Sequence, residues 1–136
     1  MVIPLGTLST RLTARPTART VAAVKQFVEL TSAEPFEPAP GVLMRPLFGE
    51  NAMINLLDME PGATVPLHSH PHEQLGYIIE GEIVLTVAGV DHVLRPGDAY
   101  TLAGGIEHGA TAGPAGCRIL DIFHPIREDY RKLAGV

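Results

Sequence analysis

From residue 21 onward the chain consists of short apolar runs that alternate with glycine and proline. The runs have the length of β-strands, and no helical period of useful length is visible before the last residues. Many short strands at this spacing predict an all-β sandwich or barrel. The predicted strands are Lys25–Leu30, Val42–Leu47, Met53–Met59, Ala63–Leu67, Gly76–Glu80, Glu82–Val87, His92–Leu94, Ala99–Leu102, Gly109–Ala112 and Arg118–Phe123.

Turn residues separate most of these runs. Glycine tolerates positive φ and proline fixes φ, so pairs that contain them indicate chain reversals. The pairs are Pro61-Gly62, Glu80-Gly81, Ala88-Gly89, Pro96-Gly97 and Gly104-Gly105. Segment 34–41 (EPFEPAPG) is too rich in proline for an interior strand and is predicted to be a surface loop. Ile126–Ala134 predicts one short terminal helix that stops at Gly135.

The length of 136 residues fits one domain. Residues 1–20 show no sustained period and predict an irregular N-terminal segment, which leaves 21–136 as the barrel domain. The segment is rich in arginine and has no acidic residue before Glu29, as in organelle presequences. Pro16 interrupts any helix there, so a solvated end is the preferred interpretation.

Composition and charge exclude several function classes. The net charge of −5 and the absence of tryptophan disfavour binding to nucleic acid, which needs basic clusters and aromatic platforms. No long apolar span indicates a membrane segment. The single cysteine, Cys117, cannot form an internal disulfide, so a soluble protein of the cytoplasm is expected.

Two segments carry candidate metal ligands. His68 and His70 are two residues apart, which puts both side chains on one face of a strand, and Gln74 keeps the same parity. His108 follows a glycine-rich turn in the second segment. Neutral imidazoles suit several transition metals, and an amide oxygen adds a weak ligand. The alternative is that histidines are ordinary polar residues, which is our interpretation of His92 and His124; His72 is expected beside the ligands or exposed.

The two segments resemble the motifs of the cupin superfamily. The first motif matches at Gly62, His68, His70, Gln74 and Gly81, and the second at Gly97, Gly105 and His108, with Ala103 in place of the motif proline. The resemblance implies a single-domain cupin fold (a double-stranded β-helix, or jelly-roll barrel) with a short C-terminal helix. It also implies one divalent transition metal ion (Zn, Ni, Mn or Fe) on His68, His70, Gln74 and His108, and a homodimer. Gln74 replaces the usual Glu and leaves no anionic protein ligand.

The last predicted strand contributes further polar groups. Alternation puts Cys117, Ile119, Asp121 and Phe123 on one face, and a carboxylate in such an apolar row is costly unless it is paired or used. Arg127 follows the strand and could reach over the barrel mouth, where its planar fork matches a carboxylate. A structural ion pair between Asp121 and Arg127 is the alternative.

The segments HSHPHEQ (68–74) and DIFHPIREDY (121–130) resemble a group of small cupins that includes the pectin-degradation proteins. Those enzymes convert 4,5-unsaturated uronates into linear keto acids. The resemblance implies Asp121 and Arg127 as catalytic residues and Phe123 and Arg127 as substrate-binding residues. Tyr77 and Tyr100 are candidate second proton donors, with Tyr100 also a candidate substrate contact.

Three functions stay open at this point. The first is ring-opening isomerisation of a carboxylated sugar, and the second is a metal-dependent dioxygenase. The third is a polyketide-type cyclase or a non-catalytic small-molecule binder. An apolar barrel lining would favour the third, and two or more basic residues in the pocket would favour an acidic sugar. The basic candidates are Arg45, Arg95, Arg118 and Arg127.

Overall fold

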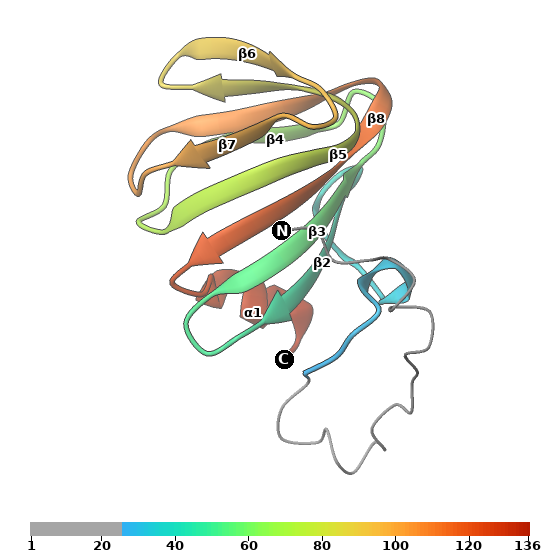
Figure 1. Ribbon diagram of the computed structural model, residues 1–136, viewed down its shortest axis with the longest axis vertical. Coiled ribbons are helices and arrows are strands. Elements are labelled where there is room, and N and C mark those ends of the chain that lie inside the picture. The colour runs from blue at the N-terminus through green and yellow to red at the C-terminus, as the bar shows by residue number, and fades with distance from the viewer. Residues whose placement is uncertain (1–25) are drawn as a thin grey trace, which may run out of the picture.

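A computed structural model describes residues 26–136 of the chain. The predicted irregular segment 1–20 and residues 21–25 lie outside the described residues. Among residues 26–136 the fold is an antiparallel β-barrel with one α-helix at the C-terminal end, which confirms the all-β prediction (Figure 1). The elements are η2 (Leu30–Ser32), β1 (Phe36–Ala39), β2 (Val42–Phe48), β3 (Met53–Met59), β4 (Thr64–His68), β5 (Glu73–Val87), β6 (Val90–Leu94), β7 (Ala99–Leu102), β8 (His108–His124) and α1 (Glu128–Ala134).

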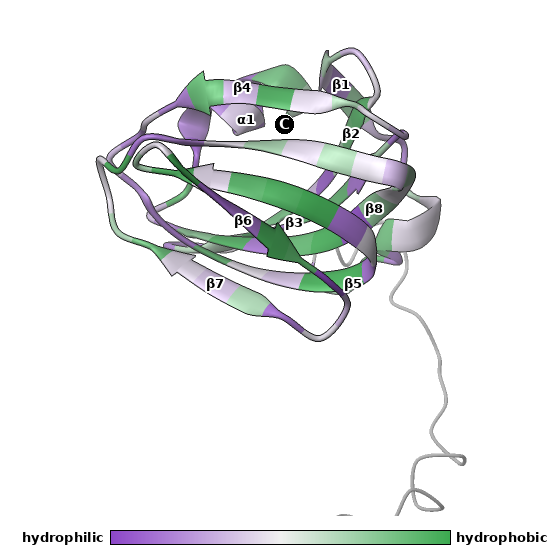
Figure 2. Ribbon diagram, turned by 90° about the horizontal axis from the view of Figure 1, so that it is seen from above, coloured by the Kyte–Doolittle hydropathy of each residue, from purple (hydrophilic) through white to green (hydrophobic). Residues whose placement is uncertain are grey.

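Two long strands, β5 and β8, hold the barrel together. They pair with each other along most of their length, and the strand order is β1-β2-β3-β8-β5-β6. β4 pairs with the first part of β8, and β7 pairs with the first part of β5. Figure 2 shows β4 and β7 on opposite sides of the barrel. The candidate ligands therefore come from β4, the loop after it, β5 and β8, and these segments meet on β5 and β8.

The predicted turn at Glu80-Gly81 is wrong, because β5 runs through it as one strand. The pairing with β8 shifts register on both sides of this dipeptide, so the extra residues form bulges instead of a reversal. Gly81 has a φ of 75°, and a Cβ there would overlap the carbonyl oxygen of Gly116. The predicted strands Gly109–Ala112 and Arg118–Phe123 join in the same way into β8.

Two predictions near the N-terminal end are also wrong. Lys25–Leu30 does not form a strand where it is described, since residues 26–29 are irregular and Leu30 begins η2. The predicted loop 34–41 contains β1 instead. Pro38 is compatible with β1 because β1 is an edge strand that pairs only with β2, and an edge strand tolerates a missing backbone donor.

The barrel interior is apolar except near one end. Its core includes Ile78, Ile83, Ile119 and Phe123, all at most 2% exposed. Helix α1 packs beside β1 and β2 at the end of the barrel away from β6 (Figure 1). It begins after Arg127 and ends at Gly135, whose φ of 75° stops the helix as predicted. None of the helices within residues 26–136 is long and apolar enough to span a membrane.

A candidate metal centre inside the barrel

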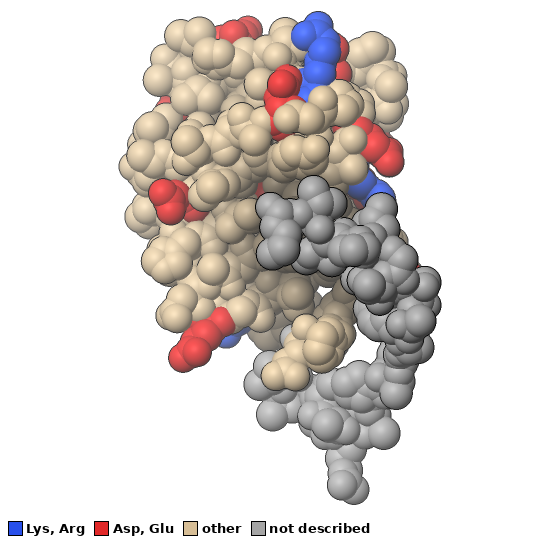
Figure 3. Space-filling view, in the orientation of Figure 1, with Lys and Arg blue, Asp and Glu red and all other residues tan. Residues whose placement is uncertain are grey.

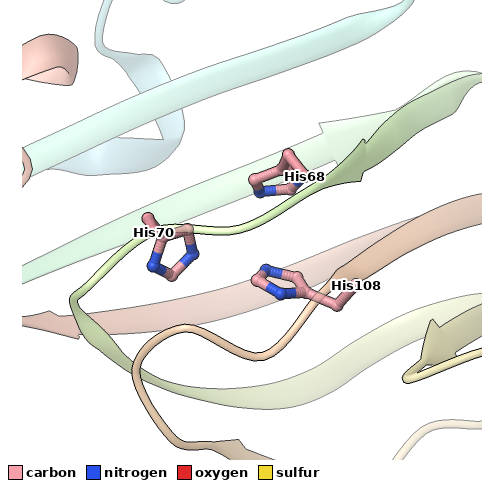
Figure 4. Close-up of side chains that lie close together, drawn as sticks. All are labelled: His68, His70 and His108. Atoms are coloured by element: carbon pink, nitrogen blue, oxygen red, sulfur yellow. The ribbon is translucent and has the colours of Figure 1, made fainter.

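Three histidines from two segments meet inside the barrel. His68 ends β4, His70 lies in the loop after it, and His108 begins β8 directly opposite His68 (Figure 4). One ligand nitrogen from each ring can be chosen so that all three lie within 4.8 Å of one another. The predicted group of His68, His70 and His108 is therefore one cluster.

The glycine-rich turn brings the two segments together. Gly104 leaves no room for a side chain, because a Cβ there would overlap the carbonyl oxygen of Pro71. Gly105, with a φ of 86°, donates its backbone N–H to the carbonyl of His70 at 2.8 Å. This close approach fixes the loop that carries His70 against the strand that begins with His108.

Each histidine is held by a backbone carbonyl on its Nδ1 side. His68 donates to Pro66 at 2.8 Å, His108 to Ile106 at 2.8 Å and His70 to His72 at 3.1 Å. A carbonyl can only accept, so the ring proton sits on Nδ1 and the Nε2 lone pair is free. The Nε2 of His108 is buried without a hydrogen-bond partner among the described residues. Such backbone partners orient histidines that bind metals.

Gln74 adds a fourth donor atom beside this cluster. Its Oε1 lies 3.1 Å from Nε2 of His70, and its Nε2 lies 3.4 Å from Oδ1 of Asp121. The Asp121 carboxylate accepts the amide N–H and so turns the amide oxygen towards His70. Two lone pairs then face each other at 3.1 Å, an arrangement that a cation between them would stabilise. The donor set of three imidazoles and one amide oxygen fits a divalent transition metal.

The pKa values of two candidate ligands favour the neutral imidazole. Burial, with the nearby Arg127 and His108, lowers the pKa of His70 to about 4. Burial also lowers the pKa of His108. Both rings are therefore neutral at neutral pH, which is the form that coordinates metal ions.

Asp121 lies next to the cluster on the wall of the same cavity. It is 3% exposed, and the hydroxyl of Tyr100 donates to its Oδ1 at 2.6 Å. Burial raises the pKa of Asp121 to about 6, although the hydrogen bonds from Tyr100 and Gln74 act in the opposite direction. Both hydrogen bonds go to Oδ1, which leaves Oδ2 as the oxygen available to a ligand.

Arg127 does not pair with Asp121, so the alternative interpretation of a structural ion pair between them is wrong. Its Nε and Nη2 donate instead to the two carboxylate oxygens of Asp129, at 3.0 and 2.8 Å. The guanidinium lies over the ring of Tyr130 at 4.0 Å and near that of Phe123 at 5.1 Å. Arg127 is 6% exposed, and its Nη1 has no partner among the described residues. The fork expected to receive a carboxylate is thus occupied, and Nη1 is the free group.

The cavity between these groups is small, about 30 Å³, and has room for an ion and a water molecule. Its polar wall consists of His68, Gln74, Tyr100, His108 and Asp121. The remaining wall is largely apolar, with Met44, Leu57, Val65, Ile83, Leu85 and Ile119. Tyr130 reaches it from α1.

Other predicted residues lie away from the cavity. Tyr77 is 49% exposed on the outer face of β5, opposite to Gln74 and Gly76, because it has odd parity with them. The structure therefore does not bring the Tyr77 hydroxyl to the site. Arg45 and Arg118 both bind Asp58 outside the barrel, and Arg95 pairs with Glu82 in solvent. His92 and His124 are exposed, and only His72 lies near the ligands.

The sequence interpretation missed several residues at the site. Asp129 holds Arg127, and Tyr130 lines the cavity, although both lay in the predicted helix. Gly76 makes space for Tyr100. Asn55 is fully buried in β3, and the signal that could have revealed it is that the residues with the same parity in this predicted strand are all apolar.

A jelly-roll barrel with a cluster of three histidines inside it has the architecture of a cupin and could hold a metal ion. A family model for the cupin domain, Cupin_2, matches residues 55–123, which is half of the chain. The chain belongs to this family.

Curated relatives and a solved structure agree with this assignment. Over 68 residues the chain is 40% identical to the HTH-type transcriptional regulator PuuR of Escherichia coli. The matched segment covers 48% of this chain and 37% of that protein. The chain thus spans well under half of the regulator. It is 27% identical over 84 residues to the pectin degradation protein KdgF of Dickeya dadantii, 61% of this chain and 76% of that protein. The structure of KdgF from Halomonas sp. superposes with a TM-score of 0.73 at 26% identity, over 79% of this chain and 99% of that one.

Proposed function

We propose that this cupin is a metal-dependent isomerase that opens and tautomerises the ring of a carboxylated sugar, a 4,5-unsaturated uronate. The observation that carries the proposal is the arrangement around Phe123. His70 of the metal cluster lies against the Phe123 ring at 5.7 Å, and Arg127 lies near the same ring at 5.1 Å. Asp121 is two residues before Phe123 on the same inward face. The similarity to two KdgF proteins supports this choice of reaction.

The residues of the site have different roles in the proposed ring opening. His68, His70, His108 and Gln74 would hold a divalent metal ion, which would supply Lewis acidity to a substrate oxygen. Nη1 of Arg127 binds the carboxylate, and the bond to Asp129 keeps that guanidinium in place. The low exposure of the site excludes bulk water from the reacting ring.

Asp121 carries the proton in this scheme. As the ring C–O bond breaks, the anomeric hydroxyl loses a proton, and ring carbon 4 gains one as the enol becomes a ketone. No atom is added or lost, so a single carboxyl group that accepts and returns a proton is enough. Oδ2 is the exchanging oxygen, because the hydrogen bonds from Tyr100 and Gln74 engage Oδ1.

The test is turnover of 4,5-unsaturated galacturonate by metal-loaded protein, followed by loss of the ultraviolet absorbance of its double bond. We expect turnover well above background, and its loss in His108→Ala and Asp121→Asn. His92→Ala, which changes an exposed histidine of β6, is the matched control and keeps full activity. Absence of turnover with each of Zn, Ni, Mn and Fe would reject the proposal.

A second candidate is favoured by the apolar part of the cavity wall. Of the four arginines considered from the sequence, only Arg127 is buried beside the site, whereas seven aliphatic or methionine side chains line the cavity. This lining suits a polyketide-type cyclase or a binder of an apolar ring acid. A dioxygenase ranks lower, since no carboxylate belongs to the ligand set and ferrous sites usually carry one.

A further inference from the structure

Asn55 is an unusual residue for its place in the barrel. It lies in the middle of β3, is 0% exposed, and both polar atoms of its amide lack a hydrogen-bond partner within residues 26–136. In the pairing of β3 with β8 it stands directly opposite Asp121. Directly opposite residues of an antiparallel pair share a face, with Cβ atoms about 5 Å apart. The Asn55 side chain therefore points into the barrel beside the Asp121 carboxyl group.

A buried amide without partners destabilises the fold, because its hydrogen bonds to water are lost and not replaced. The residues that share its face on β3, Met53, Leu57 and Met59, are all apolar and buried. A leucine would match the shape of asparagine and avoid this penalty. The amide is therefore better explained by a ligand that binds it than by the stability of the barrel.

The size of the cavity indicates where that ligand would be. A ring acid is larger than about 30 Å³, so its binding must widen the cavity. Asn55 does not line the cavity itself but adjoins it through Asp121, which does. Two groups next to this wall have unpaired polar atoms, the amide of Asn55 and Nη1 of Arg127. A ligand that widened the cavity towards these two groups would give both of them hydrogen-bond partners.

We propose that Asn55 binds a ring hydroxyl of the substrate while Arg127 binds its carboxylate. This rests on the proposed function, in that the ligand is taken to be a hydroxylated ring acid. A hydroxyl both donates and accepts, and so does an amide, so the two groups match. An aromatic or saturated hydrocarbon ring leaves the amide unpaired. Asn55 is thus a specificity-determining residue that selects sugar acids over apolar ring acids.

The test compares two carboxylates that differ in their hydroxyls. Binding of galacturonate and of cyclohexanecarboxylate to the metal-loaded full chain is measured by calorimetry. We expect wild type to prefer galacturonate, and Asn55→Leu to bind galacturonate at least tenfold more weakly and cyclohexanecarboxylate within twofold of wild type. Met53→Leu, on the same face of the same strand, is the matched control and leaves both affinities unchanged. The melting temperature of Asn55→Leu should equal or exceed that of wild type.

Other outcomes overturn the role of Asn55. One is that wild type and Asn55→Leu bind galacturonate with equal affinity, and another is that wild type prefers cyclohexanecarboxylate. A third is that Asn55→Leu has a lower melting temperature and loses affinity for both ligands equally, which would mean a structural role. Turnover of the unsaturated uronate separates the two proposals. Asn55-dependent binding without turnover rejects the isomerase and keeps Asn55, whereas turnover with unchanged kcat/KM in Asn55→Leu rejects Asn55. If wild type neither binds galacturonate nor turns over the unsaturated uronate, both proposals are rejected.

Discussion

The ring of Tyr100 lies directly against Gly76, so closely that a Cβ at residue 76 would overlap the ring carbon that carries the hydroxyl. The two residues face each other across the pairing of β5 with β7, and Gly76 also faces Asp121 across the pairing with β8. The missing side chain lets the Tyr100 hydroxyl reach Oδ1 of Asp121 at 2.6 Å. Gly76 is thus a positioning residue for the Asp121 carboxyl group.

Gly76→Ala is expected to destabilise the protein by about 1–3 kcal/mol, because the methyl group forces the Tyr100 ring aside in a tightly packed interior. Urea unfolding measures this change. The control is the same substitution in a Tyr100→Ala background, where the ring is gone and the cost should nearly vanish. An equal cost in both backgrounds would show that the contact with Tyr100 is not the reason.

Metal binding should stabilise the fold, since the four ligands are brought together only in the folded barrel. At a free metal concentration 100 times the dissociation constant, the stabilisation is about 2.7 kcal/mol, which corresponds to about 10 °C in melting temperature. A chelator should remove this increment from wild type and from His92→Ala. In His108→Ala the chelator should have no effect, and elemental analysis should find no stoichiometric metal. A chelator effect that persists in His108→Ala would place the metal elsewhere.

The grouping of His108 with His68 and His70 depended on the resemblance to the cupin motifs, whereas part of the candidate site was predictable because its determinants are local. The spacing of His68 and His70 puts both side chains on one side of the same segment. Asp121 followed from the alternation of a single strand. These features depend on residues within a few positions of one another, and sequence patterns record such relationships directly.

The failures have a common physical cause, which is that sequence patterns do not show which partner a group finds. The dipeptide Glu80-Gly81 has the residues of a turn, and only the pairing of β5 with β8 makes it a bulge. For Arg127 the sequence does not show that Asp129, two residues along, accepts hydrogen bonds from Nε and Nη2 and leaves Nη1 without a partner among the described residues. Tyr77 was chosen by its chemistry, although its parity directs it outward.

Arg127→Lys is expected to raise KM for the uronate about tenfold with a smaller change in kcat, because binding of the carboxylate is lost in ground and transition state alike. A lysine has no planar fork that Asp129 can hold while another nitrogen stays free. Asp129→Asn should shift KM in the same direction by a smaller factor. Steady-state kinetics measure both, with Arg95→Lys, an exposed arginine paired with Glu82, as the control. An unchanged KM in Arg127→Lys would remove the carboxylate from this position.

Asp58 should make the stability of the barrel depend on pH. Hydrogen bonds from Arg118, at 2.7 and 2.9 Å, and the charges of Arg118 and Arg45 lower the pKa of the Asp58 carboxyl from 3.8. A lowered folded-state pKa gives stability that is present above the unfolded value and is lost as the pH falls through the folded value. Asp58→Asn should therefore cost about 2 kcal/mol at pH 7 and progressively less below about pH 4.

Urea unfolding at several pH values checks this dependence. Asp91→Asn is the control, because its carboxylate accepts a single hydrogen bond from Thr86 in the exposed hairpin of β5 and β6. It should have a small effect at every pH. A difference between wild type and Asp58→Asn that stays constant down to pH 3 would contradict the assigned ion pairs.

Association into a homodimer stays a prediction, but the surface expected for it changes. The strand predicted at Lys25–Leu30 would have been well placed to pair with a second copy, but residues 26–30 do not form a strand. The outer faces of β5 and β8 instead expose Leu75, Tyr77, Ile79 and Ile122, and the surface drawn tan in Figure 3 is interrupted by scattered charged side chains. Exposed apolar side chains grouped on one sheet face are typical of an interface. If two copies associate there, Ile122→Lys should halve the mass measured by light scattering. Val93→Lys, at an exposed apolar residue of β6, should leave the mass unchanged, and equal masses for wild type and Ile122→Lys would exclude this face as the interface.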